Sequence, residues 1–241
     1  MAEDWKTALV CICILNGMVY LPGISNDFVE IDDEGQVKNP NLYPLSVTNI
    51  QSLFTSETVS MYQPLTSLSF AIIIACFGRN GNCDAVYFHV FALLLHTLNA
   101  MLVYCVFDEL MHNSTIAIAI CLIFASHPLQ VETVSWVSAT STLQFSFFYL
   151  IAMLAYIRYL KSPKKPHYYG LSICSFICSG FSKICAINLC AVLCMIDTYV
   201  HGFKHAISLK SIRNKVPYSL VSFTLGCIGI FFRSPHTALT S

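Results

Sequence analysis

The stretch Val86–Phe107, VYFHVFALLLHTLNAMLVYCVF, runs for 22 residues without a charged side chain. At a rise of about 1.5 Å per residue, a helix of this length is roughly 33 Å long, and crossing the hydrocarbon core of a bilayer takes roughly 20 such residues. The stretch therefore predicts a membrane-spanning helix. We therefore interpret the rest of the sequence as that of a chain surrounded by lipid.

The composition of the whole chain fits this solvent. Of its 241 residues, 56% are hydrophobic and 11% are charged, against roughly 25% charged in an ordinary soluble domain. Acidic and basic residues number 13 each, so no strong field of either sign is present to recruit nucleic acid or a cationic partner. The 12 cysteines lie mostly within apolar runs, where we expect them to act as small packing residues.

Six further apolar runs reach or approach the length of a span: Thr7–Tyr20, Thr115–Ala125, Thr142–Leu160, Tyr168–Phe181, Ala186–Val200 and Val216–Phe232. Polar flanks or a thinner bilayer can complete the shorter ones. The first run could also be a signal peptide, but no small-residue cleavage site follows it, which favours a retained anchor. The expected fold class is an all-α integral membrane protein, a single domain over residues 1–241 with about seven transmembrane helices. No tetratricopeptide or other repeat is visible.

The basic residues predict the orientation of these helices. Eight of the 13 fall on one side: Arg158, Lys161, Lys164, Lys165, Lys204, Lys210, Arg213 and Lys215. The excess of Lys and Arg in cytoplasmic loops makes this side the inside, so the N-terminus is inside and the first loop, about residues 22–85, is outside. Within that loop, Val47–Phe54 and Leu65–Phe77 are expected to be short helices on the outer membrane surface. The alternative, an eighth span at Leu65–Phe77, is disfavoured because the run is short.

An acidic segment, Asn26–Asp33, follows the first span directly. Two adjacent carboxylates such as Asp32 and Asp33 repel, so one can hold a proton while the other accepts one, which suits a general base for an acceptor hydroxyl. By spacing alone, an acidic solvated loop or a cation-binding turn is the simpler interpretation.

Four further polar side chains interrupt the apolar pattern. His127 and Glu132 emerge together where the third span ends, where they suit a phosphate or a sugar hydroxyl, although a His beside Pro is commonly just a helix-terminus residue. Lys183 separates two apolar runs, and a lysine at the bilayer centre costs about 2.5–3.5 kcal/mol. We therefore expect an anionic partner for Lys183, either Glu132 or the phosphate of a lipid. Asp197 faces a similar cost, for which Lys204 is the expected partner.

Taken in order, six motifs resemble a known family. They are NDFVEIDD (26–33), KNPN (38–41), YQPLT (62–66), HPLQVETVSWV (127–137), SK (182–183) and ID (196–197). Their order and spacing, from about Asn26 to Phe232, resemble the membrane half of the transmembrane and tetratricopeptide-repeat O-mannosyltransferases and their bacterial relatives, within the polytopic GT-C glycosyltransferase superfamily.

The resemblance implies a GT-C-like bundle that transfers a hexose, mannose in the eukaryotic family, from a polyprenyl or dolichyl phosphate to a hydroxyl of a protein or glycan on the non-cytoplasmic side. It implies that Asp32 is the catalytic base and that Asp33 assists or orients it. Binding of donor or substrate then falls to His127, Glu132, Lys183, Tyr62 and Gln63. No divalent metal and no cofactor besides the lipid-phosphate donor is implied. The implied partners are membrane lipids, the donor, the acceptor and other membrane subunits, in a multi-pass protein of the endoplasmic reticulum or a bacterial inner membrane.

The sequence departs from the family pattern at three places. Gln130 replaces a His, Ile31 replaces an aromatic residue, and Ala139–Thr142 replaces a charged stretch with an Arg, the natural bidentate clamp for a phosphate. The chain also stops at Ser241, before the later helices and repeats of full-length members, as a truncated relative would. An alternative function is therefore a non-catalytic, GT-C-like membrane subunit or lipid-binding scaffold. A small transporter would need ionisable residues midway along facing helices, which the sequence hardly offers apart from Lys183.

Overall fold

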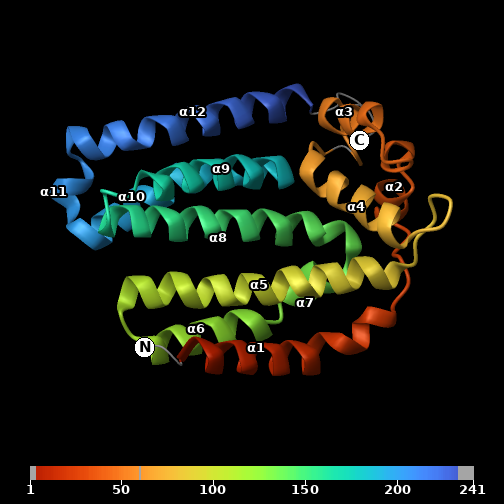
Figure 1. Ribbon diagram of the computed structural model, residues 1–241, viewed down its shortest axis with the longest axis horizontal. Helices are drawn as coiled ribbons and strands as arrows, with labels where there is room; N and C mark the ends of the chain where they lie inside the picture. The colour runs from red at the N-terminus through yellow and green to blue at the C-terminus, as the bar shows by residue number, and fades with distance from the viewer. Residues whose placement is uncertain (1–3, 60, 233–241) are drawn as a thin grey trace, which may run out of the picture.

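The computed structural model describes residues 4–59 and 61–232, so the outermost residues of the predicted domain, 1–3 and 233–241, lie outside the described part. Within the described ranges the chain is helical and contains no β-strand. Long helices lie side by side in a bundle, and the short helices of residues 33–77 gather at one end of it (Figure 1). The predicted all-α class is confirmed.

Each of the seven predicted spans falls on a helix. The helices are α1 (Asp4–Tyr20), α5 (Ala85–Met111), α6 (Ser114–Ser126), α8 (Thr140–Lys161), α9 (Pro166–Ser182), α10 (Leu189–His201) and α12 (Leu209–Phe231). The sixth span differs from the prediction at its start, because a 3-10 helix, η4 (Ile184–Asn188), precedes α10.

Four segments are long and apolar enough to cross a membrane: Trp5–Ser25, Ala85–Met111, Val137–Lys161 and Ile184–His201. Helix α6 is apolar but shorter, and α9 and α12 are not among the four. The chain is therefore a multi-pass membrane protein by the length and composition of these helices. Crossing by all seven stays a prediction.

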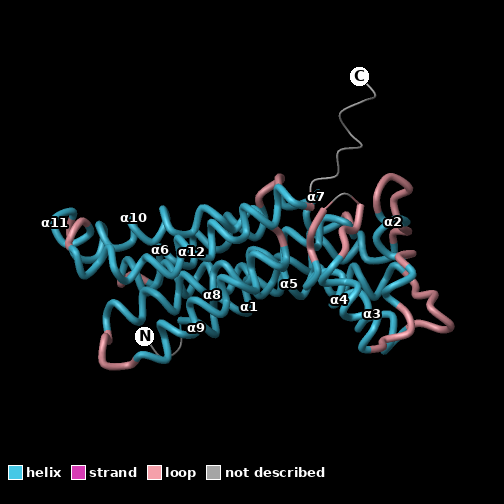
Figure 2. The backbone as a smooth tube through the Cα atoms, turned by 90° about the horizontal axis from the view of Figure 1, so that it is seen from above, coloured by secondary structure: helices cyan, strands magenta, loops and turns pink. Residues whose placement is uncertain are grey.

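The short elements follow α1 and precede α5 in the chain. They are η1 (Leu21–Ser25), α2 (Asp33–Val37), η2 (Pro40–Leu42), α3 (Val47–Thr55) and α4 (Pro64–Phe77). Ser46 starts α3 by accepting a hydrogen bond from the Asn49 amide at 3.2 Å, and Pro64 occupies the first turn of α4, where no N–H is needed. The predicted short helices are thus present, and they cluster at one end of the bundle (Figure 2). Their depth in a membrane stays a prediction.

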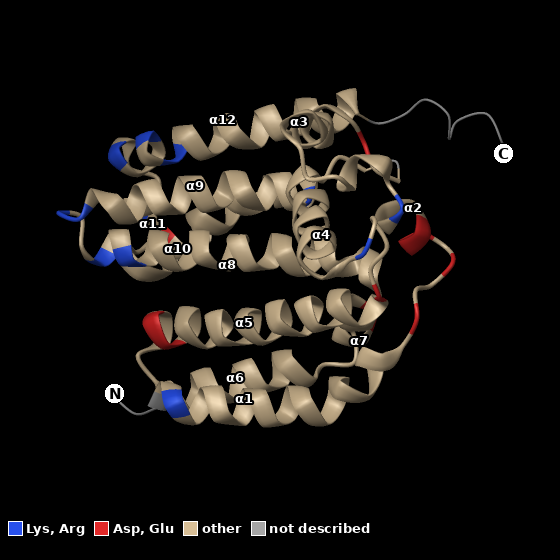
Figure 3. Cartoon of the chain, turned by 45° about the vertical axis from the view of Figure 1, so that its right-hand side comes forward, with Lys and Arg blue, Asp and Glu red and all other residues tan. Residues whose placement is uncertain are grey.

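Most Lys and Arg positions lie at one end of the bundle and most Asp and Glu positions at the other, with the acidic end of α5 as an exception (Figure 3). Lys164 and Lys165 lie in the connection between α8 and α9, at the end where α12 also begins. The acidic loop that contains Asp32 lies at the opposite end. This separation agrees with the predicted arrangement, whereas the compartment that each end faces stays a prediction.

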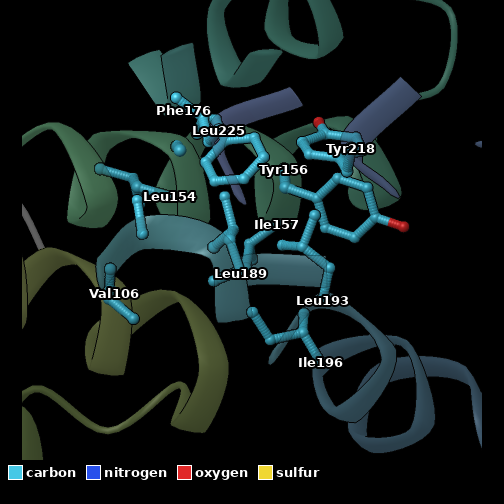
Figure 4. Close-up of a cluster of buried hydrophobic side chains, with 12 residues drawn as sticks. Val106, Leu154, Tyr156, Ile157, Phe176, Leu189, Leu193, Ile196, Tyr218 and Leu225 are labelled. Atoms are coloured by element: carbon cyan, nitrogen blue, oxygen red, sulfur yellow. The ribbon is translucent and has the colours of Figure 1, made fainter. Parts of the chain in front are cut away.

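The largest cluster of buried apolar side chains lies where α5, α8, α9, α10 and α12 meet (Figure 4). It includes Val106, Leu154, Tyr156, Ile157, Phe176, Leu189, Leu193, Ile196, Tyr218 and Leu225. Helices α9 and α12 approach closely because Gly180 has no side chain: a Cβ there would lie 2.3 Å from Leu225 Cδ1. Small residues at such crossings are typical of helix packing in membranes, where van der Waals contact drives association.

A buried ion pair joins α10 to α12 beside this cluster. Lys215 Nζ donates to Asp197 Oδ2 and, at 2.6 Å, to Ser211 Oγ. Ser211 Oγ also donates to Asp197 Oδ2, and Tyr156 OH donates to Asp197 Oδ1 at 3.0 Å. The prediction that Lys204 pairs with Asp197 is wrong. Lys204 lies exposed in α11 (Phe203–Ala206), whereas the packing of α12 on α10 brings Lys215 to the carboxylate.

Replacing Lys215 by Met should leave the Asp197 carboxylate buried without its cation. We expect the free energy of unfolding to fall by about 3–5 kcal/mol, the usual effect of removing one partner of a buried pair. The Asp197→Asn/Lys215→Met double variant should lose less, and Lys204→Met should change little. Unfolding in detergent micelles measures all three. Equal losses in the single and double variants would show that the packing of Lys215, and not its charge, is what matters.

Candidate functional site

Asp33 fixes the first loop to the helical bundle. Its carboxylate is 1% exposed. Oδ1 accepts hydrogen bonds from the Ser138 backbone N at 2.8 Å and from Ser138 Oγ at 2.5 Å, and Oδ2 accepts one from the Val29 amide at 2.9 Å. Donors to an ionised carboxylate make strong hydrogen bonds, and a buried carboxylate requires them. The loop is thereby held to η3 (Val137–Ala139), 105 residues further along the chain.

The neighbouring Asp32 has different surroundings. It is half-buried and stands at the N-terminal cap of α2, but its side chain makes no capping hydrogen bond. Within residues 4–59 and 61–232, its carboxylate has neither a hydrogen-bond donor nor a cation within ion-pair distance. The two adjacent acids thus have different roles. Hydrogen-bond donors engage the Asp33 carboxylate, whereas the Asp32 carboxylate is available to a ligand.

Lys183 lies half-buried between α9 and η4. Its Nζ donates to Thr142 Oγ1 at 2.8 Å. In the described part of the chain, no carboxylate lies within ion-pair distance of it, so Glu132 is not the partner there. A neutral hydroxyl satisfies one donor of the ammonium group but leaves its positive charge uncompensated.

One short segment contacts both Asp33 and Lys183. Ser138 and Thr142 are four residues apart where η3 runs into α8, a separation of about 6 Å along a helix. Ser138 holds the acidic loop, and Thr142 holds the lysine. In the sequence this stretch stands out only by the charges that it lacks, because neutral hydroxyls give no signal of their own.

A cavity of about 400 Å³ lies beside Lys183. Its other lining residues are Met61, Tyr62, Gln63, Ile184, Cys185, Ile187, Gly229 and Phe232. Gln63 is 3% exposed, and its Oε1 has no hydrogen-bond partner in the described chain. An unpaired buried polar atom of this kind costs about 1–3 kcal/mol. The cavity therefore offers an apolar wall, one cation and one amide oxygen that a bound donor group would satisfy.

The start of α4 places Tyr62 and Gln63 in this cavity. Thr66 Oγ1, in the first turn of α4, donates to the Ser182 carbonyl at 3.2 Å, next to Lys183. Tyr62 OH donates to the Phe54 carbonyl at 3.0 Å, and its ring stacks on Phe232 with centroids 4.4 Å apart. Burial raises the pKa of Tyr62, which keeps its hydroxyl neutral.

His127 and Glu132 do not line the cavity beside Lys183. His127 ends α6, is exposed, and its Nδ1 accepts a hydrogen bond from the Leu129 amide at 3.2 Å. Glu132 lies exposed in the first turn of α7 (Gln130–Ser135). The His127 imidazole thus serves the turn at Pro128, because it accepts a hydrogen bond from a backbone amide of that turn. The cavity thus brings together Lys183, Tyr62 and Gln63 and leaves the other two predicted donor residues outside it.

Together these groups can do two kinds of chemistry. Asp32 can accept a proton from a hydroxyl, while Lys183 and Gln63 can bind the polar head of a ligand whose apolar part fills the cavity. Within the described residues, no group of three or more His, Cys, Asp or Glu side chains is placed to hold a metal ion.

Comparison with known proteins finds distant relatives. The chain is 26% identical over 199 residues to protein O-mannosyl-transferase tmtc2 of Xenopus laevis, covering 76% of this chain and 23% of the relative. For protein O-mannosyl-transferase TMTC1 of Homo sapiens the identity is 25% over 209 residues, covering 78% and 22%. For TMTC2 of Homo sapiens it is 27% over 206 residues, covering 80% and 24%.

The chain thus spans about a quarter of the length of these curated relatives. No protein-family model and no solved structure matches it. The similarity supports a distant relation to the O-mannosyltransferases that the six motifs resemble.

Ser138→Ala tests the anchor of the acidic loop. The variant keeps the backbone donor and loses the hydroxyl donor, and a hydrogen bond to a charged group contributes about 1.5–3 kcal/mol. We expect faster amide hydrogen exchange at Val29 and a lower free energy of unfolding. Ser141→Ala is the matched control, because Ser141 is also buried but its hydroxyl contacts only the Ser138 carbonyl, at 3.5 Å. Identical behaviour of the two variants would contradict the anchor.

Proposed function

We propose that this chain is a glycosyltransferase that moves a hexose from a lipid phosphate to a hydroxyl of a protein or glycan. The observation that carries the proposal is the cavity that Lys183 lines together with apolar side chains. In the described part of the chain no carboxylate pairs with Lys183, whose ammonium group contacts only a neutral hydroxyl there. The Asp32 carboxylate, which has no partner in the described chain, belongs to a loop that is anchored at Ser138. Ser138 lies one helical turn before Thr142, which accepts the hydrogen bond from Lys183. The relatives named as protein O-mannosyl-transferases favour mannose as the sugar and a protein as the acceptor.

The cavity suits a polyprenyl or dolichyl phosphate donor. Its volume of about 400 Å³ lies within the range of roughly 300–1,000 Å³ that is usual for ligand sites. Ile184, Ile187 and Phe232 can contact the first isoprene units. Lys183 then meets the phosphate as a point charge, and Gln63 accepts a hydrogen bond from a sugar hydroxyl.

The proposed transfer is a single displacement. Asp32 accepts the proton of the acceptor hydroxyl as its oxygen attacks the anomeric carbon of the donor. The bond from that carbon to the phosphate oxygen breaks, and the lipid phosphate leaves with the electron pair, stabilised by Lys183. Both carboxylate oxygens of Asp33 already accept hydrogen bonds, so Asp33 does not act as the base. Its hydrogen bonds to Ser138 hold the loop and thereby position Asp32. Attack opposite the leaving phosphate inverts the anomeric carbon.

The proposed orientation places Asp32 outside the cytoplasm. The connections at the opposite end hold Lys164, Lys165 and the basic start of α12, which is typical of cytoplasmic loops. Donor and acceptor then meet on the non-cytoplasmic side of the endoplasmic reticulum or of a bacterial inner membrane. Additional membrane subunits remain a prediction from the family resemblance.

Asp32→Asn should abolish sugar transfer, because removing a general base typically costs about 100- to 10,000-fold in rate. The measurement is transfer of labelled mannose from a polyprenyl-phosphate mannose to acceptor protein. Glu34→Gln is the control, since Glu34 is exposed and pairs with Lys38. Full activity of Asp32→Asn would contradict the proposal. A wild-type chain that binds the lipid but turns over no such donor would show the non-catalytic scaffold instead.

Lys183→Met should weaken binding of polyprenyl phosphate but leave binding of the uncharged polyprenol unchanged. Loss of a hydrogen bond between charged groups, about 1.5–3 kcal/mol, corresponds to about 10- to 150-fold in affinity. Lys38→Met is the control, because Lys38 is an exposed lysine of the loop that also contains Asp32. If Lys183→Met weakened both lipids equally, the phosphate would not lie at Lys183.

A further inference from the structure

A second pocket lies at the basic end of the bundle, far from Asp32. It has a volume of about 70 Å³ and opens between the end of α8, the end of α10, α11 and the start of α12. The polar residues lining it are His201, His205, Lys210, Asn214, Ser211 and Asp197. None of these residues takes part in the transfer proposed above.

Asp197 is the only acid among these residues, and other side chains neutralise its negative charge. Both oxygens of Asp197 are engaged, Oδ1 by Tyr156 and Oδ2 by Ser211 and Lys215. Within the described chain, Lys210 has no carboxylate at ion-pair distance. The net charge facing the pocket is therefore positive, and it is set by Lys210.

The surrounding basic residues reinforce this charge. Arg158 and Lys161 are paired with Glu109, at 3.2 and 2.9 Å. Lys164 and Lys165, in the connection that also contributes Pro163 to the pocket, are exposed and have no partner among the described carboxylates. An anion at the pocket would meet an attractive field from several sides.

Backbone geometry brings the two imidazoles together. Gly202 has a φ of +84°, a conformation that side chains disfavour, and it turns the chain sharply from α10 into α11. The rings of His201 and His205 then lie with centroids 4.6 Å apart. Two imidazoles, the Lys210 ammonium and the Asn214 amide supply the hydrogen-bond donors that a phosphate group, with its several acceptor oxygens, requires.

Exposed apolar residues beside the pocket identify the kind of molecule that carries this phosphate. Phe203, Ile207 and Leu209 are 67%, 57% and 83% exposed. Phe203 belongs to α11, Ile207 follows its end and Leu209 begins α12, close in the chain to His205 and Lys210. Apolar side chains alternating with basic ones at the end of membrane helices match the boundary between acyl chains and headgroups.

We propose that this pocket binds the phosphate headgroup of an anionic phospholipid at the basic end of the bundle. The headgroup phosphate contacts Lys210, His201 and His205, and the acyl chains lie against Phe203 and Leu209. The site is independent of the donor cavity beside Lys183, and it would stand if the proposed sugar transfer failed.

The test uses the full chain in nanodiscs of phosphatidylcholine, with and without phosphatidylinositol, and native mass spectrometry to count retained lipids. We expect the wild type to retain phosphatidylinositol over phosphatidylcholine. Lys210→Gln should weaken that retention about tenfold, as expected for loss of a charge-assisted hydrogen bond. Lys164→Gln removes the same charge from the same end but outside the pocket, where it contributes only to the general field, so it should weaken retention much less than Lys210→Gln does.

The double variant His201→Gln/His205→Gln checks the pocket independently, should Lys210→Gln fold poorly, and it is expected to weaken retention as well. Equal retention of the two lipids by the wild type would overturn the proposal. So would equal losses in Lys210→Gln and Lys164→Gln, which would indicate a general surface attraction. Displacement of phosphatidylinositol by millimolar inorganic phosphate would assign the pocket to free phosphate and overturn the lipid headgroup.

Discussion

The hydrogen bonds between the Asp33 carboxylate and Ser138 are the constraint on which the candidate site depends. A carboxylate at the edge of an apolar bundle is stable only with donors, and these come from a segment 105 residues away. The hydrogen bonds from Ser138 therefore hold the acidic loop at the start of α8. One helical turn later Thr142 meets Lys183, so a single short segment sets both the acid and the cation. Asp32, next to an immobilised neighbour, is held in place, while its own carboxylate has no partner among the residues that the structure describes.

The same requirement shapes the opposite end of the molecule. Asp197 and Lys215 are buried together, and their mutual neutralisation, with Tyr156 and Ser211, makes burial tolerable and joins α8, α10 and α12. That pair is internally balanced, and the exposed lysines of this end, Lys164, Lys165, Lys204 and Lys210, are left to set its surface charge. The bundle therefore has two polar ends of different character. One end holds the acidic loop and, linked to it through the segment from Ser138 to Thr142, the lysine of the cavity, and the other end holds a basic surface.

The helices were predictable because lipid imposes a length and a composition on each span, and both are visible in runs such as Val86–Phe107. The special position of Lys183 was predictable for the same reason, since a cation within an apolar run needs an explanation. The partners were not. Ser138 and Thr142 are ordinary hydroxyl residues, Lys215 reaches Asp197 only through the packing of α12 on α10, and nearness in sequence pointed instead to Lys204. His127 accepts a hydrogen bond within a local turn, and Glu132 lies exposed in the first turn of α7. Both positions follow from the direction of the backbone, which the sequence composition does not reveal.

The most direct test of the central claim is an experimental structure of the chain in a lipid nanodisc with a bound polyprenyl phosphate. We expect the phosphate within hydrogen-bond distance of Lys183 Nζ, the first isoprene units against Ile184 and Phe232, and the Asp32 carboxylate open to the same chamber. A phosphate held by His127 and Glu132, or an Asp32 side chain separated from the lipid by the body of the bundle, would contradict it.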